Sequence, residues 1–129
     1  MGATTAGATG GSGGRGGRGG DPFFGKLTPL EAALARIETG HRVVAAMAAA
    51  EPRGLLEAIG RHCQDLANVT LHCANPSREY PCFTDPGLAG RLELAVMFLT
   101  AKVRPLQGQG HVHYVPQHLS QWVRNLKRG

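Results

Sequence analysis

The stretch that decides the fold is TGHRVVAAMAAAEPRGLLE, residues 39–57. It predicts the end of a helix, a buried strand, a small-residue turn and the start of a second helix. Gly40 suits the left-handed end of a helix, and the apolar run 43–47 is typical of a strand covered on both faces of a parallel sheet. Pro52 opens the next helix. Ligands of open parallel sheets bind outside the carboxyl ends of the strands, so the turn at 48–52 is the first candidate site.

Helices and strands alternate along the rest of the chain. A capping box of Thr28 and Glu31, with Pro29 at the first helical position, predicts a helix that precedes the opening stretch. Further strands are expected at 68–73, 92–99 and 111–115, a long loop at 74–86, a short helix or turn at 101–107 and a last helix at 119–126. This order predicts an α/β fold with a largely parallel sheet and flanking helices.

The first 20 residues differ in composition from the rest. Half of them are glycine and none is acidic, so they bury too little apolar surface to fold, and we expect a disordered Gly/Arg-rich tail at 1–20 and one domain at 21–129. Of the formal net charge of +5, two units come from Arg15 and Arg18 and leave +3 on the domain. The segment GGRGGRGGD resembles an RGG-type RNA-binding tail, so a non-catalytic RNA-binding protein is the alternative function. Two repeats without an intervening aromatic residue favour a low-complexity leader, and nucleic acid is not the expected partner.

Cysteine content and hydropathy bear on the compartment. The three cysteines form no paired motif, which is typical of reduced thiols in a cytoplasmic protein. No apolar run is long enough to span a bilayer, so no membrane partner is expected. The acid-free start with two arginines leaves a mitochondrial location as the alternative, although glycine spacing prevents an amphipathic helix.

Several segments, taken in order, resemble the N-terminal domain of the acetyl-CoA hydrolase/transferase family, which includes acetate and 4-hydroxybutyrate CoA-transferases. They are LTPLEAALARIETGHRVV, AAAEPRGLLEAI, DLANVTLH, and DPGLAGRLELAVMFLTAKVR followed by HVHYVPQHLSQ. The order and spacing of these segments carry the resemblance, because none is a catalytic motif. One departure is the turn after the first strand, where the family often has glycines and this chain has alanines, which resist positive φ.

The resemblance implies an activity that this chain does not complete. Family members move CoA between carboxylates or from acyl-CoA to water, and a glutamate carboxylate attacks the thioester carbonyl. That glutamate belongs to the family's C-terminal domain and would lie past Gly129. We therefore expect no catalytic residue here, no permanently bound cofactor, coenzyme A or acyl-CoA and a short-chain carboxylate as substrates, and a C-terminal CoA-transferase domain or subunit as partner.

Six residues are candidates for the wall of the CoA cleft: Ala49, Ala50, Glu51, Pro52, Arg78 and His118. Backbone amides of the turn could face an anion or oxyanion, the alternative being an ordinary tight turn. Glu51 faces the cleft or is a helix N-terminal acid favoured by the dipole. Arg78, in the long loop, suits a phosphate or carboxylate but is also explained as a solvated arginine. His118 lies in the matched YVPQHLS segment and is a candidate for an interdomain cleft.

Metal and thiol chemistry are not expected. His111 and His113 are two residues apart on a predicted strand and should share a face, which His72 and His118 could join, but no metal motif occurs and CoA transfer needs no metal. Cys82 has no base at motif spacing and is not expected to be a nucleophile. If a partner domain is missing, apolar surface should be exposed near Trp122 and along the strand 92–99, whose central residue is Val96.

Overall fold

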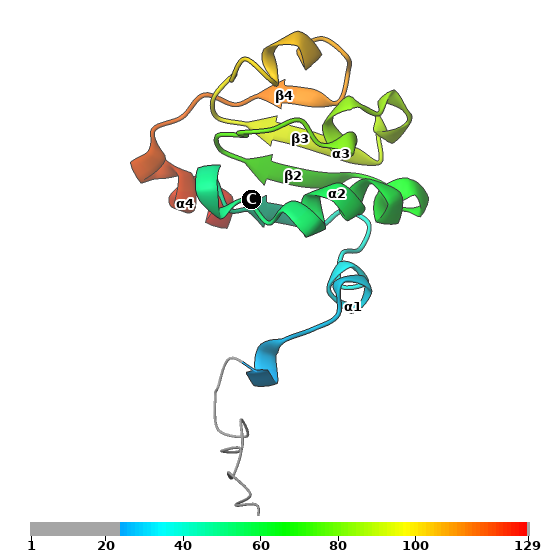
Figure 1. Cartoon of the computed structure of the whole chain (residues 1–129). Coiled ribbons are helices and arrows are strands. Elements are labelled where there is room, and N and C mark those ends of the chain that lie inside the picture. The colour runs from blue at the N-terminus through cyan, green and yellow to red at the C-terminus, as the bar shows by residue number, and fades with distance from the viewer. Residues whose placement is uncertain (1–23, 129) are drawn as a thin grey trace, which may run out of the picture.

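The computed structural model describes residues 24–128. The expected disordered tail and its RGG-like segment lie outside the described residues. Within 24–128, one parallel sheet has the strand order β1-β2-β3-β4, with β1 at Arg42–Ala45, β2 at Val69–Cys73, β3 at Leu92–Val96 and β4 at Val112–Tyr114. The α-helices are α1 at Leu30–Leu34, α2 at Arg53–His62, α3 at Pro81–Thr84 and α4 at Leu119–Arg128. The predicted α/β fold with a parallel sheet is confirmed (Figure 1).

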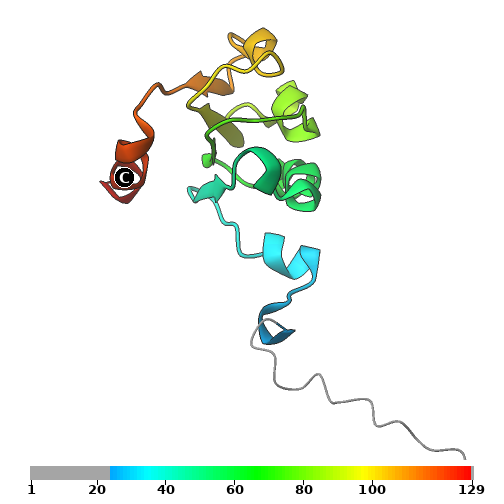
Figure 2. The same ribbon diagram turned by 60° about the vertical axis from the view of Figure 1, so that its left-hand side comes forward.

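The sheet is covered unevenly. Crossovers of the same hand between successive parallel strands lie on one face of the sheet. Figure 2 shows α2 and α3, which belong to these crossovers, on one side of the sheet, and α4, which follows the last strand, on the other. Leu92, Leu94 and Val96 face the helices and are buried, whereas Glu93 between them points to the other face and is half-buried. The sequence predicts that the run 43–47 is covered on both faces. This was wrong for the face opposite α2, because Val44 of β1 is 50% exposed.

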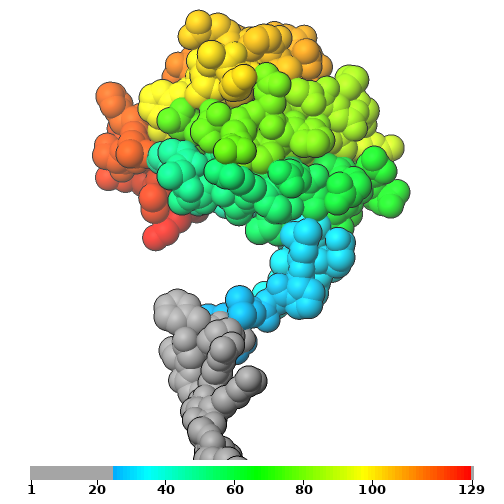
Figure 3. All heavy atoms as spheres, in the orientation of Figure 1, coloured from blue at the N-terminus to red at the C-terminus, as the bar shows by residue number. Residues whose placement is uncertain are grey.

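The core lies between the sheet and the helices α2 and α3. It contains Leu56 and Ile59 of α2, Phe83 of α3 and Leu71 of β2. Gly60 lets α3 approach α2, since a Cβ at this position would lie 3.3 Å from the Cβ of Cys82. Figure 3 shows α2, α3 and the loop between β2 and α3 covering this face, with α1 projecting from its lower edge.

The first helix is shorter than its sequence predicts. α1 begins at Leu30, Pro29 takes the position before it, and no side chain caps it, so the predicted capping box is absent. The helix ends at Leu34, and Gly40 instead occupies the turn before β1 with φ of 80°. The left-handed conformation expected of Gly40 is confirmed, but it serves a turn and not the end of α1.

The predicted exposure of apolar surface holds at one of its two places. In α4, which buries none of its residues, Leu119 and Val123 are exposed. Val96, in contrast, is fully buried because β3 lies between β2 and β4. The expectation of exposed apolar surface was therefore wrong for residues 92–97, since β3 is an interior strand whose helix-facing side chains enter the core. Phe98, which follows the strand, is exposed.

No helix within residues 24–128 is both long enough and apolar enough to cross a membrane.

Candidate functional site

The turn after β1 is built from small residues in a strained backbone. Residues Ala48–Ala50 form a 3-10 turn, and Ala48 has φ of 55°, in the left-handed region that disfavours a Cβ. The turn reverses the chain from the carboxyl end of β1 into α2, whose first residue is Arg53. The sequence predicts that Pro52 opens this helix, whereas in the structure Pro52 takes the position directly before its first residue.

Strain at Ala48 leads to a stability prediction. We expect Ala48→Gly to raise the free energy of unfolding by about 0.5 kcal/mol, because relief of a left-handed alanine, about 1–2 kcal/mol, exceeds the added freedom of the unfolded glycine, up to about 1 kcal/mol. Urea unfolding measures the difference. Gly40→Ala is the matched control, since it places a Cβ at φ of 80° and should lower stability. A destabilised Ala48→Gly variant would contradict the assignment of strain.

The turn's backbone amides are already engaged. Ala50 N–H donates to the Met47 carbonyl at 3.2 Å, Glu51 N–H to the Ala48 carbonyl at 3.2 Å, and Arg53 N–H to the Glu51 carbonyl at 2.9 Å. Pro52 has no N–H to offer. Of the two alternatives that the sequence leaves open, the ordinary tight turn describes the amides of residues 50, 51 and 53, because they donate to carbonyls of the turn itself.

Glu51 is the centre of the polar network at this end of the sheet. Its side chain is buried. The Ser77 N–H donates to Oε1 at 2.7 Å, the Ser77 hydroxyl donates to Oε2 at 2.6 Å, and the Tyr80 hydroxyl donates to Oε2 at 2.9 Å. Three donors from the loop after β2 thus converge on one carboxylate of the turn after β1 and hold the two segments together.

These contacts set the protonation of the carboxylate. Burial opposes ionisation of Glu51, but hydrogen bonds from Ser77 and Tyr80, together with the nearby charge of Arg78, outweigh it and lower the pKa of Glu51 below its ordinary value of 4.5. The Tyr80 pKa is raised, first by burial and then by its bond to the carboxylate. Glu51 is therefore an ionised hydrogen-bond acceptor at neutral pH.

The lowered pKa predicts an acid-sensitive stability. Between the folded-state pKa of Glu51 and 4.5, the unfolded chain binds a proton that the folded chain does not, so stability falls as the pH falls through this range. We expect the urea midpoint to decline below pH 4.5 and the decline to be shallower in Glu51→Gln. Glu93, whose pKa is also lowered, contributes the remaining slope. Equal pH profiles for the two proteins would contradict this role of Glu51.

The structure brings Glu51 and Arg78 together but not His118. Arg78 is exposed in the same loop as Ser77, and its charge acts on Glu51. His118 is exposed and lies away from Glu51. It lines a cavity of about 490 Å³ beside α4, together with Pro116, Gln117, Gln121 and Asn125. Residues 49–52 do not line that cavity.

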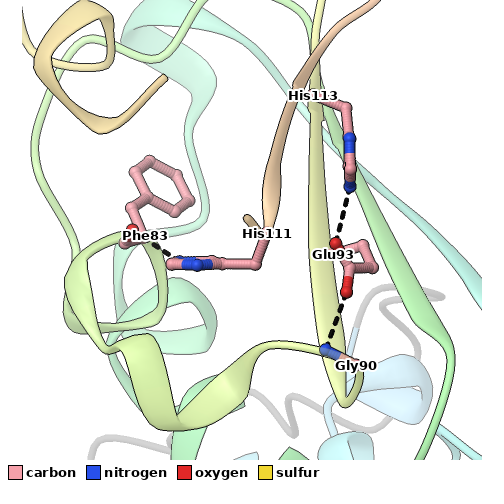
Figure 4. Close-up of polar contacts among 5 residues, drawn as sticks. All are labelled: Phe83, Gly90, Glu93, His111 and His113. Carbon is pink, nitrogen blue, oxygen red and sulfur yellow. Dashed lines mark hydrogen bonds and ion pairs between the residues drawn. The ribbon is translucent and has the colours of Figure 1, made fainter. Parts of the chain in front are cut away.

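His111 and His113 point to different sides of the sheet (Figure 4). The fully buried His111 ring contacts the Phe83 carbonyl through Nε2 at 2.9 Å on the helix side. His113 contacts Glu93 at 2.6 Å on the opposite face. The expectation of a shared face was wrong, since β4 begins at Val112 and His111 follows Gly110, which has φ of 92°, outside the strand's alternation.

Residues 24–128 give no support to metal or thiol chemistry. No three His, Cys, Asp or Glu side chains within 24–128 are arranged to hold a metal ion. Cys82 is buried, its Sγ donates to the Leu56 carbonyl at 3.2 Å, and burial raises its pKa to about 12. It is thus an unreactive core thiol.

Sequence reasoning selected Glu51 and Arg78 but missed Ser77 and Tyr80 as partners of Glu51. Ser77 lies 26 residues and Tyr80 lies 29 residues after Glu51 in the chain. The available signal was the segment NPSREYP in the long loop, where Ser77 and Tyr80 are hydrogen-bond donors that each stand next to a proline. Pairing across such a separation becomes visible only when β1 and β2 lie side by side.

Comparison with known proteins finds a similar fold in the solved structures of one protein, RipA. No protein-family model matches the sequence, and no characterised protein sequence matches it. The crystal structure of RipA from Yersinia pestis matches with a TM-score of 0.64 and 27% sequence identity, over 75% of this chain and 25% of RipA. A single-site mutant of RipA matches with a TM-score of 0.66, also at 27% identity, over 79% of this chain and 26% of that one. The chain thus spans about a quarter of the length of RipA, and over that quarter it shares RipA's fold.

Proposed function

We propose that this chain is the N-terminal part of a CoA-transferase or acyl-CoA hydrolase and forms one wall of a CoA cleft. The observation that carries the proposal is the fold shared with RipA, whose structure is of the CoA-transferase type. The ordered segments that resemble the acetyl-CoA hydrolase/transferase family support the same assignment independently. Acyl-CoA and short-chain carboxylates are the proposed substrates.

The turn and the loop bound to Glu51 form the proposed wall. They lie at the carboxyl ends of β1 and β2, where ligands of parallel sheets bind. Glu51 positions this wall but is a poor nucleophile, because three donors occupy its oxygens and its pKa is lowered. This supports the proposal that the attacking glutamate belongs to a C-terminal domain or subunit.

Arg78 is the proposed contact for a phosphate or carboxylate of the substrate. It is exposed on the loop that Ser77 and Tyr80 anchor, so its backbone is held while its side chain stays accessible. A guanidinium suits phosphate oxygens because it donates two parallel hydrogen bonds. Coenzyme A carries several phosphates and is the matching ligand.

A titration of the full chain with coenzyme A, followed by amide NMR shifts, tests the proposed wall. We expect shifts at residues 48–52 and 75–80, a several-fold weaker affinity in Arg78→Gln, and unchanged affinity in Arg36→Gln, an exposed control outside the wall. Shifts elsewhere only, or equal affinity in Arg78→Gln, would overturn the assignment. In an acetate–acetyl-CoA exchange assay, the chain alone should give no turnover, and measurable turnover would refute the dependence on a C-terminal glutamate.

A further inference from the structure

The first strand leaves one edge of the sheet without a neighbouring strand. In the order β1-β2-β3-β4, β1 lies at one end and pairs only with β2. The Thr70 N–H donates to the His41 carbonyl at 2.9 Å, so alternation along β1 directs the backbone N–H and carbonyl of Val44 away from β2. Free edges of sheets are usually protected by charged residues or prolines, and residues 43–45 contain neither. The edge of β1 is therefore suited to pairing with a further strand.

An apolar cavity lies beside this edge. It has a volume of about 220 Å³, is bounded by α1, β1 and α2, and is lined entirely by apolar residues. Val43, Val44 and Ala45 of β1 belong to its lining, and so does Leu55 of α2, which is exposed. Side chains of a strand alternate between the two faces of a sheet. A further strand beside β1 would therefore direct every second side chain towards this cavity.

The helix after the last strand lies on the other face of the sheet and reaches the end formed by β1. Figure 2 shows α4, in red, on the side away from α2 and α3, level with β1 and β2 and distant from β4. Asn125 and Leu126 of α4 line a cavity that extends to Arg42, the first residue of β1. The chain has therefore passed back over the sheet from β4 towards β1.

The hand of the crossovers determines where a strand after α4 can pair. The connections that contain α2 and α3 lead from β1 to β2 and from β2 to β3. A crossover of the same hand on the opposite face leads in the reverse direction along the sheet. In the part of the chain that the structure describes, β2 and β3 already have a neighbour on each side. A strand that follows α4 therefore finds its free position beside β1.

We propose that the free edge of β1 binds a parallel strand that follows α4 in the proposed C-terminal part, with apolar side chains of that strand in the cavity between α1, β1 and α2. The identity of this partner rests on the proposed function, whereas the position and direction of the strand follow from the place of α4 and the hand of the crossovers. The added strand makes β1 an interior strand and reverses the strand order beside it. Open α/β sheets bind ligands at such a reversal, which here adjoins the turn at 48–52.

An extension of the full chain tests the proposal. A short Gly/Ser linker and a strand of alternating valine and threonine are added after Gly129, and amide hydrogen exchange is followed by NMR. We expect exchange of the Val44 N–H to slow by about tenfold or more, because the added strand supplies a hydrogen-bond acceptor at the free edge. Nuclear Overhauser contacts should place the beginning of the added strand beside the beginning of β1, as a parallel direction requires.

The other edge of the sheet provides a matched control within the same molecule. The Leu94 N–H donates to the His111 carbonyl and the Val115 N–H donates to the Val96 carbonyl, so alternation directs the Tyr114 N–H away from β3. Exchange of the Tyr114 N–H should stay unchanged in the extended chain. A second extension, with a proline in the middle of the added strand, leaves residues 1–129 unaltered and should remove the slowing at Val44.

Four outcomes would overturn the proposal: no slowing at Val44, slowing at Tyr114 equal to that at Val44, an antiparallel direction of the added strand, or the same slowing with the proline extension. If exchange at Val44 slows with rising concentration of the chain without an extension, the edge belongs to a second copy, and the proposal also fails. No coenzyme A is present in this experiment. Its failure therefore leaves the proposed CoA wall standing, and a failed titration with coenzyme A leaves the pairing at β1 standing.

Discussion

Replacing Glu51 with alanine is expected to lower the free energy of unfolding by about 3 kcal/mol. The change removes an ionised acceptor from the Ser77 N–H, the Ser77 hydroxyl and the Tyr80 hydroxyl. Hydrogen bonds to charged groups contribute about 1.5–3 kcal/mol each, and Ser77 lies at the surface, where water replaces part of the loss. Urea unfolding measures the total, and hydrogen exchange of residues 75–80 should report local release of the loop.

Two further variants separate the network from general effects of charge. Glu51→Gln keeps the volume and one carbonyl acceptor, so it should lose about half as much stability as the alanine variant. Glu57→Ala removes an exposed glutamate from α2 and should change stability by less than about 0.5 kcal/mol. If Glu51→Ala lowered the free energy of unfolding no more than Glu57→Ala does, the Glu51 carboxylate would not anchor the loop at residues 75–80.

Replacing Phe83 with alanine is expected to lower the free energy of unfolding by about 4 kcal/mol, the usual cost for a fully buried phenylalanine. Its side chain is 0% exposed. Its ring meets the Tyr80 ring edge to face, with centroids 5.3 Å apart. Loss of this ring leaves a cavity between α3 and the sheet. It also removes the packing of Tyr80, whose hydroxyl donates to Glu51.

The chain contains a matched control for this change. Phe98 is 51% exposed at the end of β3, and Phe98→Ala should cost less than about 1 kcal/mol. Phe83→Leu retains most of the apolar volume and keeps the protein folded for comparison if the alanine variant is too unstable to measure. A Phe83→Ala variant no less stable than Phe98→Ala would contradict the position of Phe83 in the core.

Local signals determined the element types well. The apolar, β-branched runs became β2 and β3, and Pro52 directly precedes α2. Such signals act over a few residues, so a single sequence carries them. Element ends were less predictable: α1 stops at Leu34, although the apolar spacing continues to Ile37, which packs against the core after the helix has ended.

The candidate site was predictable in part. Glu51 and Arg78 stand out by residue type and position, and the structure brings their charges together. The direction of the turn's amides did not follow from sequence, because the amides of Ala50 and Glu51 bond within the 3-10 turn and that of Arg53 bonds to the Glu51 carbonyl. His111 was misplaced for a similar reason, since a glycine with positive φ breaks the alternation expected of a strand.

The sequence by itself determined an α/β order, a parallel sheet and a strand–turn–helix at residues 39–57 with Glu51 in its turn. Those features depend on short-range periodicity, proline and glycine. Only the tertiary structure decided that Ser77 and Tyr80 bind Glu51 and that Arg42, Thr70 and His72 lie on the face of the sheet nearer α4. The physical reason is that these groupings depend on strand order and on the side of the sheet taken by each crossover, which segments far apart in the chain set jointly.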